Sequence, residues 1–110
     1  MKPRATIRKA LSALLGSVLD GTSWRAWRVL LIAAMGEALT ADERAVFTKL
    51  TGREREPGQR VEEFVAVIGR RGGKSRAMAT LASYIAGFCD HTLVHGERGI
   101  VLCIAPDQRQ

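Results

Sequence analysis

Residues 65–75 read Val65-Ala66-Val67-Ile68-Gly69-Arg70-Arg71-Gly72-Gly73-Lys74-Ser75, an apolar run that leads into a glycine-rich turn, a lysine and a hydroxyl. The apolar run predicts a buried strand. Glycines let several backbone N–H groups converge on phosphate oxygens, the lysine supplies a positive charge, and the serine hydroxyl can bind Mg²⁺. The segment therefore predicts a nucleotide-binding loop between a strand and a helix.

This loop supplies the candidate site residues. We expect ATP and Mg²⁺ to be bound by seven consecutive residues, with the metal held through the nucleotide by the last of them: Gly69, Arg70, Arg71, Gly72, Gly73, Lys74 and Ser75. The common form, G-x-x-x-x-G-K-[ST], places its first glycine where Ile68 stands here. Because Gly69 comes one position later, we expect a shorter or differently curled loop. A helix expected over residues 74–88 would add the partial positive charge of its N-terminus.

Arg70, four positions before Lys74, makes this loop resemble the P-loop of the large terminase subunit of tailed bacteriophages, the ATPase that pumps DNA into procapsids. Both flanks are similar to the same family. Upstream stand Leu39-Thr40-Ala41-Asp42-Glu43, then Phe47, then Leu50-Thr51-Gly52-Arg53 and a short polar spacer. Downstream, Ile100-Val101-Leu102-Cys103-Ile104-Ala105-Pro106-Asp107-Gln108-Arg109-Gln110 resembles the second strand of the family and its Ala-Pro turn. The resemblance covers about residues 24–110.

The resemblance implies a role for one loop residue and a set of partners. In the family an arginine at this position contacts the γ-phosphate, so Arg70 is the expected catalytic residue. The family motor works on double-stranded DNA with a portal protein and a small terminase subunit. Its catalytic acid, coupling segment and nuclease domain come later in the family. The chain is therefore expected to be an N-terminal fragment of such a protein, and we expect no ATP hydrolysis by it alone.

The expected fold class is α/β, in two parts. Residues 1–58 are predicted to form a helical N-terminal arm, and residues 59–110 the start of a P-loop ATPase domain, an incomplete βαβ unit with parallel strands. The predicted order in that unit is a strand up to residue 68, the loop, a helix over 74–88, a loop over 90–98 and a strand over 99–105. Both strands read as near-continuous apolar runs, which is typical of buried parallel strands.

Helical periodicity organises the arm. Residues 5–19 carry apolar side chains on one helical face. A second helix follows, for which Thr22 or Ser23 can serve as the N-cap. Trp24 and Trp27 lie in this second helix, three positions apart, and we interpret them as core anchors.

A third helix is expected where Thr40-Ala41-Asp42-Glu43 has the form of a capping box, and it should run through about Leu50. The polar stretch 51–59 then reads as a connection. DNA-translocating ATPases often hold adenine with a glutamine or arginine shortly upstream of the P-loop. By that resemblance the candidates are Thr51, Arg53 and Gln59, and the alternative is an ordinary solvated loop.

Positive charge is in excess and concentrated at the start of the chain. The 110 residues contain 17 Lys and Arg against 11 Asp and Glu, a net charge of +6. Of the charged residues in 1–28, Asp20 is the one acid. This distribution favours a polyanionic partner such as DNA, although a basic helix face is usually just a solvated face.

The location of the protein follows from two further features. Two cysteines without a secretory signal indicate reduced thiols in a cytoplasm. The resemblance to phage terminases implies the cytoplasm of a bacterial host, for a phage or prophage protein. The longest apolar run, residues 29–35, is far shorter than the ~20 residues that cross a bilayer, so no membrane contact is expected.

Two other functions stay open at this point. Residues 100–110 also resemble the second strand of helicases, so the chain can be read as a fragment of a P-loop ATPase unrelated to packaging. A third reading is a non-catalytic remnant whose basic helices bind DNA but not ATP.

Overall fold

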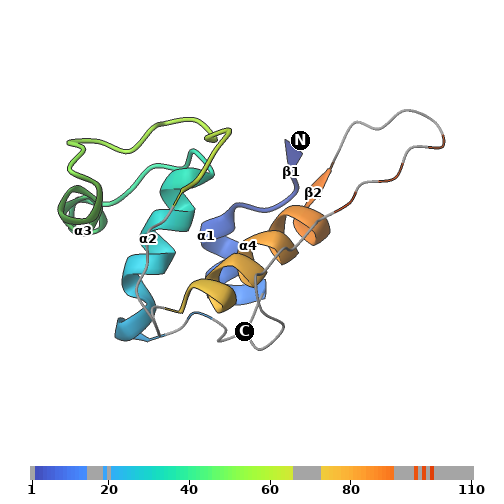
Figure 1. Ribbon diagram of the computed structural model, residues 1–110, viewed down its shortest axis with the longest axis horizontal. Coiled ribbons are helices and arrows are strands. Elements are labelled where there is room, and N and C mark those ends of the chain that lie inside the picture. The colour runs from blue at the N-terminus through green and yellow to red at the C-terminus, as the bar shows by residue number, and fades with distance from the viewer. Residues whose placement is uncertain are drawn as a thin grey trace.

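A computed structural model describes residues 2–14, 19, 21–65, 73–90, 96, 98 and 100 of the chain. These residues are mainly helical, with one two-stranded antiparallel pairing. In chain order the elements are β1 (Lys2–Pro3), α1 (Ile7–Lys9), the π-helical segment η1 (Ala10–Leu14), the 3₁₀ turn η2 (Thr22–Trp24), α2 (Arg25–Ala34), α3 (Ala41–Thr51), α4 (Lys74–Phe88) and β2 (Cys89–Asp90). Figure 1 shows α1 between α2 and α4, with α3 on the other side of α2.

The core forms where these helices meet. Its most deeply buried large side chains come from α1, α2, α4 and the turn before η2: Ile7, Leu19, Val29, Leu31 and Tyr84. Leu39 and Phe47 extend the same cluster to α3. Burying an aliphatic or aromatic side chain of this size contributes roughly 1.5–3 kcal/mol. Removal of apolar surface from water therefore holds the helices together.

The helix expected over residues 5–19 is confirmed for residues 7–14, but it changes type along its length. Thr6 caps α1, and its hydroxyl accepts the Lys9 N–H at 3.1 Å. The chain then continues as the π-helical segment η1. Ile7, Ala10 and Leu11 are all buried. Helical spacing thus identified the buried side chains, but a periodic pattern this short does not separate an α-helix from a wider π-helical turn.

Neither Thr22 nor Ser23 caps α2, and that prediction is wrong. Both residues lie inside the 3₁₀ turn η2, and the N-cap position of α2 is Trp24, which makes no side-chain capping bond. The turn satisfies backbone groups at this end, because the Arg25 N–H donates to the Thr22 carbonyl. The expectation that the tryptophans are core anchors is confirmed for Trp27, which is buried, while Trp24 is half-buried.

The capping box of α3 is confirmed. The Thr40 hydroxyl accepts the Glu43 N–H at 3.3 Å, and the Glu43 carboxylate accepts the Thr40 N–H at 2.9 Å. The helix ends one residue after the predicted end, at Thr51. Gly52 follows in the left-handed conformation with φ 76° and donates its N–H to the Thr48 carbonyl at 2.8 Å.

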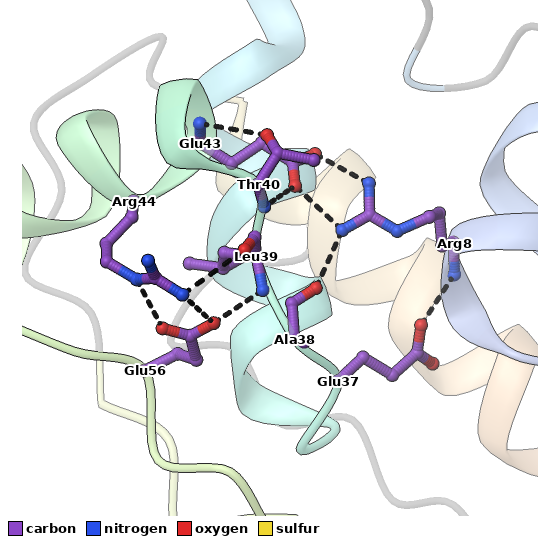
Figure 2. Close-up of polar contacts among 8 residues, drawn as sticks. All are labelled: Arg8, Glu37, Ala38, Leu39, Thr40, Glu43, Arg44 and Glu56. Atoms are coloured by element: carbon purple, nitrogen blue, oxygen red, sulfur yellow. Dashed lines mark hydrogen bonds and ion pairs between the residues drawn. The ribbon is translucent and has the colours of Figure 1, made fainter.

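Acidic side chains hold the connection between α2 and α3 against α1 (Figure 2). Glu37 accepts the Ile7 N–H at 2.6 Å, which places a carboxylate at the N-terminus of α1, where the helix dipole favours it. Arg8 donates two hydrogen bonds to the Glu43 carboxylate at 2.8 and 2.7 Å and one to the Ala38 carbonyl at 2.8 Å. Hydrogen bonding from Arg8 lowers the pKa of Glu43 to about 2.

Glu56 fixes the segment after α3 in a similar way (Figure 2). Its carboxylate accepts from the Arg44 Nε at 2.9 Å and also from the Leu39 N–H. The Glu56 side chain exposes 7% of its surface, against 39% for Arg44. Hydrogen bonding from Arg44 lowers the pKa of Glu56 to about 2. The chain from 52 to 56 is thereby tied back to the start of α3.

The N-terminal residues close over the end of α4, a contact that the sequence did not predict. β1 pairs antiparallel with β2, and Pro3 lies opposite Cys89. The Arg4 N–H donates to the Phe88 carbonyl at 2.8 Å, and the Arg4 guanidinium binds Asp90 at 3.2 Å. Because Asp90 belongs to β2, the predicted loop over 90–98 is wrong at its first residue.

The α/β expectation is supported in its helical part. The bounds of α4 match the helix predicted over 74–88, and the arm is helical. Phe64, where the first predicted strand begins, is not in a strand. The rest of the two predicted strands lies outside the described residues except for Val65 and Ile100. Neither of these is in a strand, and they expose 85% and 82% of their surface. The parallel βαβ unit stays a prediction.

Candidate functional site

The described part of the predicted loop is the junction at the start of α4. Gly73 precedes the helix with φ 78° and ψ 13°, in the left-handed region that favours glycine. Lys74 and Ser75 are the first two helical residues, and both are exposed. The Ala77 N–H donates to the Gly73 carbonyl at 3.0 Å, so the N–H groups of residues 74–76 have no acceptor within the helix. Such amides, together with the helix dipole, favour an anion.

Positive side chains gather at this junction. Lys74 and Arg76 lie in the first turn of α4, which contains no acidic residue, and Arg25 begins α2. None of the three belongs to an ion pair found in the described part of the chain; those pairs are Arg4–Asp90, Arg8–Glu43 and Arg44–Glu56. The junction therefore has positive charge available for an anionic ligand.

Two tryptophans from the start of α2 cover Gly73. A Cβ atom placed on Gly73 would lie 2.5 Å from Cζ3 and 2.6 Å from Cη2 of Trp24, and 3.5 Å from Nε1 of Trp27. The Arg76 guanidinium lies over the Trp24 ring, 5.1 Å from the ring centroid, which is a cation–π distance. The starts of α2 and α4 are thus in contact, at the end of the molecule where Figure 1 shows both helices beginning.

A groove of 480 Å³ lies between α2, α3 and the segment that follows α3. Most of its lining is apolar, with a few polar groups among the residues Leu30, Ala33, Ala34, Phe47, Leu50, Thr51, Arg53, Pro57, Val61, Glu63, Phe64 and Val65. A mainly apolar hollow with a few polar groups is the usual setting for a small molecule or cofactor.

One face of α2 connects this groove with the start of α4. Trp27, Leu30 and Ala34 are spaced as i, i+3 and i+7, so they lie along one stripe of the helix. Trp27 is beside Gly73, whereas Leu30 and Ala34 line the groove. At 1.5 Å per residue, the groove lies about 5–10 Å along the α2 axis from Trp27.

The structure brings together part of the predicted site. Gly73, Lys74 and Ser75 lie at a turn-to-helix junction, as the sequence predicts. The other predicted site residues, Gly69, Arg70, Arg71 and Gly72, lie outside the described residues, and their roles stay predictions.

The three residues predicted as candidates for binding the adenine base do not lie together in the structure. Thr51 and Arg53 line the groove, and Gln59 does not. The Gln59 backbone instead packs on Gly36, where a Cβ would lie 2.5 Å from the Gln59 carbonyl carbon. The Thr51 hydroxyl donates to the Phe47 carbonyl at 2.9 Å and accepts the Arg53 N–H at 3.1 Å, so it is already engaged. Arg53 is the remaining candidate with polar groups to offer.

Sequence reasoning missed Glu63 as a lining residue and Trp24 as the neighbour of Gly73. Glu63 lines the groove and the adjacent Glu62 does not. Which of the two faces the groove depends on how residues 61–65 pack against α2, and a sequence of two neighbouring glutamates does not reveal this. For Trp24 a signal existed, because the spacing to Trp27 places both rings on neighbouring positions of one helix face. That spacing does not reveal which residue they cover.

Comparison with known proteins adds no relative. No protein-family model matches the chain, and neither a curated protein nor a solved structure does. None of the helices in the described ranges is long and apolar enough to cross a membrane. Across the same ranges, no three His, Cys, Asp or Glu side chains are placed to hold a metal ion.

Proposed function

We propose that the chain binds ATP with Mg²⁺, with the phosphates at the start of α4. The observation that carries this proposal is the junction itself: Gly73 in the left-handed conformation directly before a helix of 15 residues, followed by Lys74 and Ser75 and no acid in the first turn. Backbone N–H groups, helix dipole and lysine all favour a phosphate there. The Ser75 hydroxyl then supplies an oxygen ligand to Mg²⁺ held by the nucleotide.

The adenine is proposed to lie in the groove between α2 and α3. Phe64, which is half-buried, offers apolar surface to the base, and the buried Phe47 forms part of the groove wall. Arg53 and Glu63 stand among this apolar lining. A guanidinium donates to ring nitrogens, and a carboxylate accepts from the exocyclic amine, so the two side chains complement the edge of adenine.

The wider role is proposed from the resemblance of residues 69–75 and their flanks to terminase large subunits. In that role the site belongs to a DNA-packaging motor that acts on double-stranded DNA in a bacterial host, with a portal protein and a small terminase subunit. Arg70 contacts the γ-phosphate. Arg25, Lys74 and Arg76 belong to none of the ion pairs found among the described residues, and their positive charge supports a polyanionic ligand at this end of the molecule.

A titration with fluorescently labelled ATP and ADP tests the proposal. Lys74→Ala is expected to weaken ATP binding about tenfold or more, since it removes a charge-assisted contact to phosphate. Arg70→Ala is expected to weaken ATP more than ADP. The control is Lys49→Ala, which removes an equal charge from the exposed surface of α3. Equal affinities in wild type, Lys74→Ala and Arg70→Ala would contradict nucleotide binding at this junction.

The same protein samples discriminate the alternative function. A basic DNA-binding remnant is expected to bind a labelled DNA duplex in a salt-dependent manner while showing no ATP binding at all. A helicase-type ATPase would bind ATP as proposed, and unwinding by the parent protein would separate it from a packaging motor.

A further inference from the structure

The start of α4 is contacted at two points by a single side chain. Atoms Cζ3 and Cη2 of the Trp24 indole occupy the position next to the Gly73 α-carbon where a side chain would begin. A Cβ atom on residue 73 would therefore clash with the ring. The face of the same ring carries the Arg76 guanidinium. Gly73 is the N-cap of α4 and Arg76 is its third residue, so the indole spans the first helical turn.

This arrangement restricts the backbone where phosphate would bind. A glycine in free chain moves readily between left- and right-handed conformations, because it has no Cβ. Gly73 has φ 78°, and the Trp24 ring occupies the space beside it. The ring therefore disfavours movements of Gly73 toward α2. The backbone conformation of Gly73 sets the direction of the N–H groups of residues 74–76. It also sets the direction in which the Lys74 side chain leaves the helix.

Arg76 is restrained in the same way. Its side chain is exposed, yet its guanidinium rests on the ring instead of extending into solvent. The negative face of the indole ring attracts the guanidinium even at an exposed site. The charge of Arg76 is thus kept near the first turn of α4.

We propose that Trp24 is a positioning residue for the phosphate site, which it preorganises by holding Gly73 and Arg76 in place. This inference rests on the proposed function. Trp24 does not itself contact the phosphates. Trp24 holds Gly73 and Arg76 in the conformation that binds phosphate, so less conformational entropy is lost when the ligand binds. A site that is already fixed in its bound conformation has a higher affinity for its ligand.

The test compares ATP with adenosine in calorimetric titrations of the whole chain. Trp24→Ala is expected to weaken ATP binding about tenfold and to leave adenosine binding unchanged, since only ATP uses the start of α4. Trp24→Phe, which keeps a ring but does not reach as far as Cζ3 and Cη2, is expected to fall between. Phe88→Ala is the matched control, because it removes a half-buried aromatic ring from the far end of α4.

The ratio of the two affinities is informative because partial unfolding lowers both by the same factor. A parallel loss of ATP and adenosine binding in both Trp24 variants would show a merely structural role and overturn the inference. Unchanged ATP binding in Trp24→Phe and Trp24→Ala would overturn it as well. If Lys74→Ala weakens ATP binding while the Trp24 variants do not, the proposed function stands and only the role of Trp24 is overturned. If the wild-type protein binds no ATP, the proposed function and the role of Trp24 are both overturned.

Discussion

Arg8 and Glu43 join two segments that are 35 residues apart through a pair of hydrogen bonds, in which Nη1 of Arg8 donates to Oε2 of Glu43 at 2.8 Å and Nη2 donates to Oε1 at 2.7 Å. The same carboxylate completes the capping box of α3 by accepting the Thr40 N–H. One side chain thus serves a local and a long-range contact at once. The Glu43 side chain is 17% exposed, so water screens the pair only in part.

Glu43→Gln is expected to destabilise the protein by about 1–2 kcal/mol, because an amide keeps the capping hydrogen bond but loses the charge opposite Arg8. Chemical denaturation followed by circular dichroism measures the change. Glu54→Gln is the control, since Glu54 is exposed and makes none of the hydrogen bonds found here. Equal losses in the two variants would mean that the Arg8 pair contributes nothing of its own.

Stability is expected to fall with acid. The pKa values of Glu43 and Glu56 are both lowered to about 2 in the folded protein. A carboxyl group with a lowered pKa stabilises the fold above its unfolded value, ~4.3, and that contribution is lost as pH falls toward the folded value. The thermal midpoint should therefore drop between about pH 5 and pH 2. A Glu43→Gln, Glu56→Gln double variant should show a flatter dependence over this range.

Tyr84→Phe is expected to cost about 1–2 kcal/mol, because the Tyr84 hydroxyl donates to the Ala5 carbonyl at 2.6 Å and the side chain is fully buried. The loss should loosen the N-terminal residues from α4. Amide hydrogen exchange at Arg4, whose N–H donates to the Phe88 carbonyl, and at Ala5 should increase in Tyr84→Phe and stay unchanged at the capping box of α3. Unaltered exchange at both places would show that β1 is held independently of Tyr84.

Gly73→Ala and Gly52→Ala form a matched pair for the contact with Trp24. Both glycines are left-handed, with φ 78° and 76°, so alanine is strained by roughly 1–2 kcal/mol at each. A Cβ at Gly52 meets nothing within 4 Å, whereas at Gly73 it meets the Trp24 ring. Overpacking adds about 1–3 kcal/mol at Gly73. This excess should largely disappear when Gly73→Ala is made in a Trp24→Ala protein, and a persistent excess would exclude the ring as its cause.

Glu63→Gln and Glu62→Gln test the proposed base site. Replacing Glu63 should weaken ATP binding severalfold, because the carboxylate is proposed to accept from the exocyclic amine, and should leave inorganic triphosphate binding unaffected. Glu62 is exposed and does not line the groove, so Glu62→Gln should match the wild type. If the two variants weaken ATP equally, the groove does not hold the base.

Local signals in the sequence were sufficient for several elements. The capping box at Thr40 and Glu43 depends on residues three apart, and the bounds of α4 depend on a run of helix-forming residues after a glycine. The junction of Gly73, Lys74 and Ser75 was predicted for the same reason. Contacts between near neighbours in the chain can be predicted from sequence because they form the same way wherever the segment occurs.

Tertiary structure decided what those elements touch. Arg8 meets Glu43, β1 pairs with β2, and Trp24 covers Gly73, and each contact joins segments separated by 35 residues or more. The predicted caps Thr22 and Ser23 failed because a 3₁₀ turn satisfied the backbone at that place instead. The sequence by itself determined where α3 and α4 begin and which helix faces are apolar. Which face meets which depends on packing all of them at once into a single core, because burial rewards the sum of contacts and not any one local pattern.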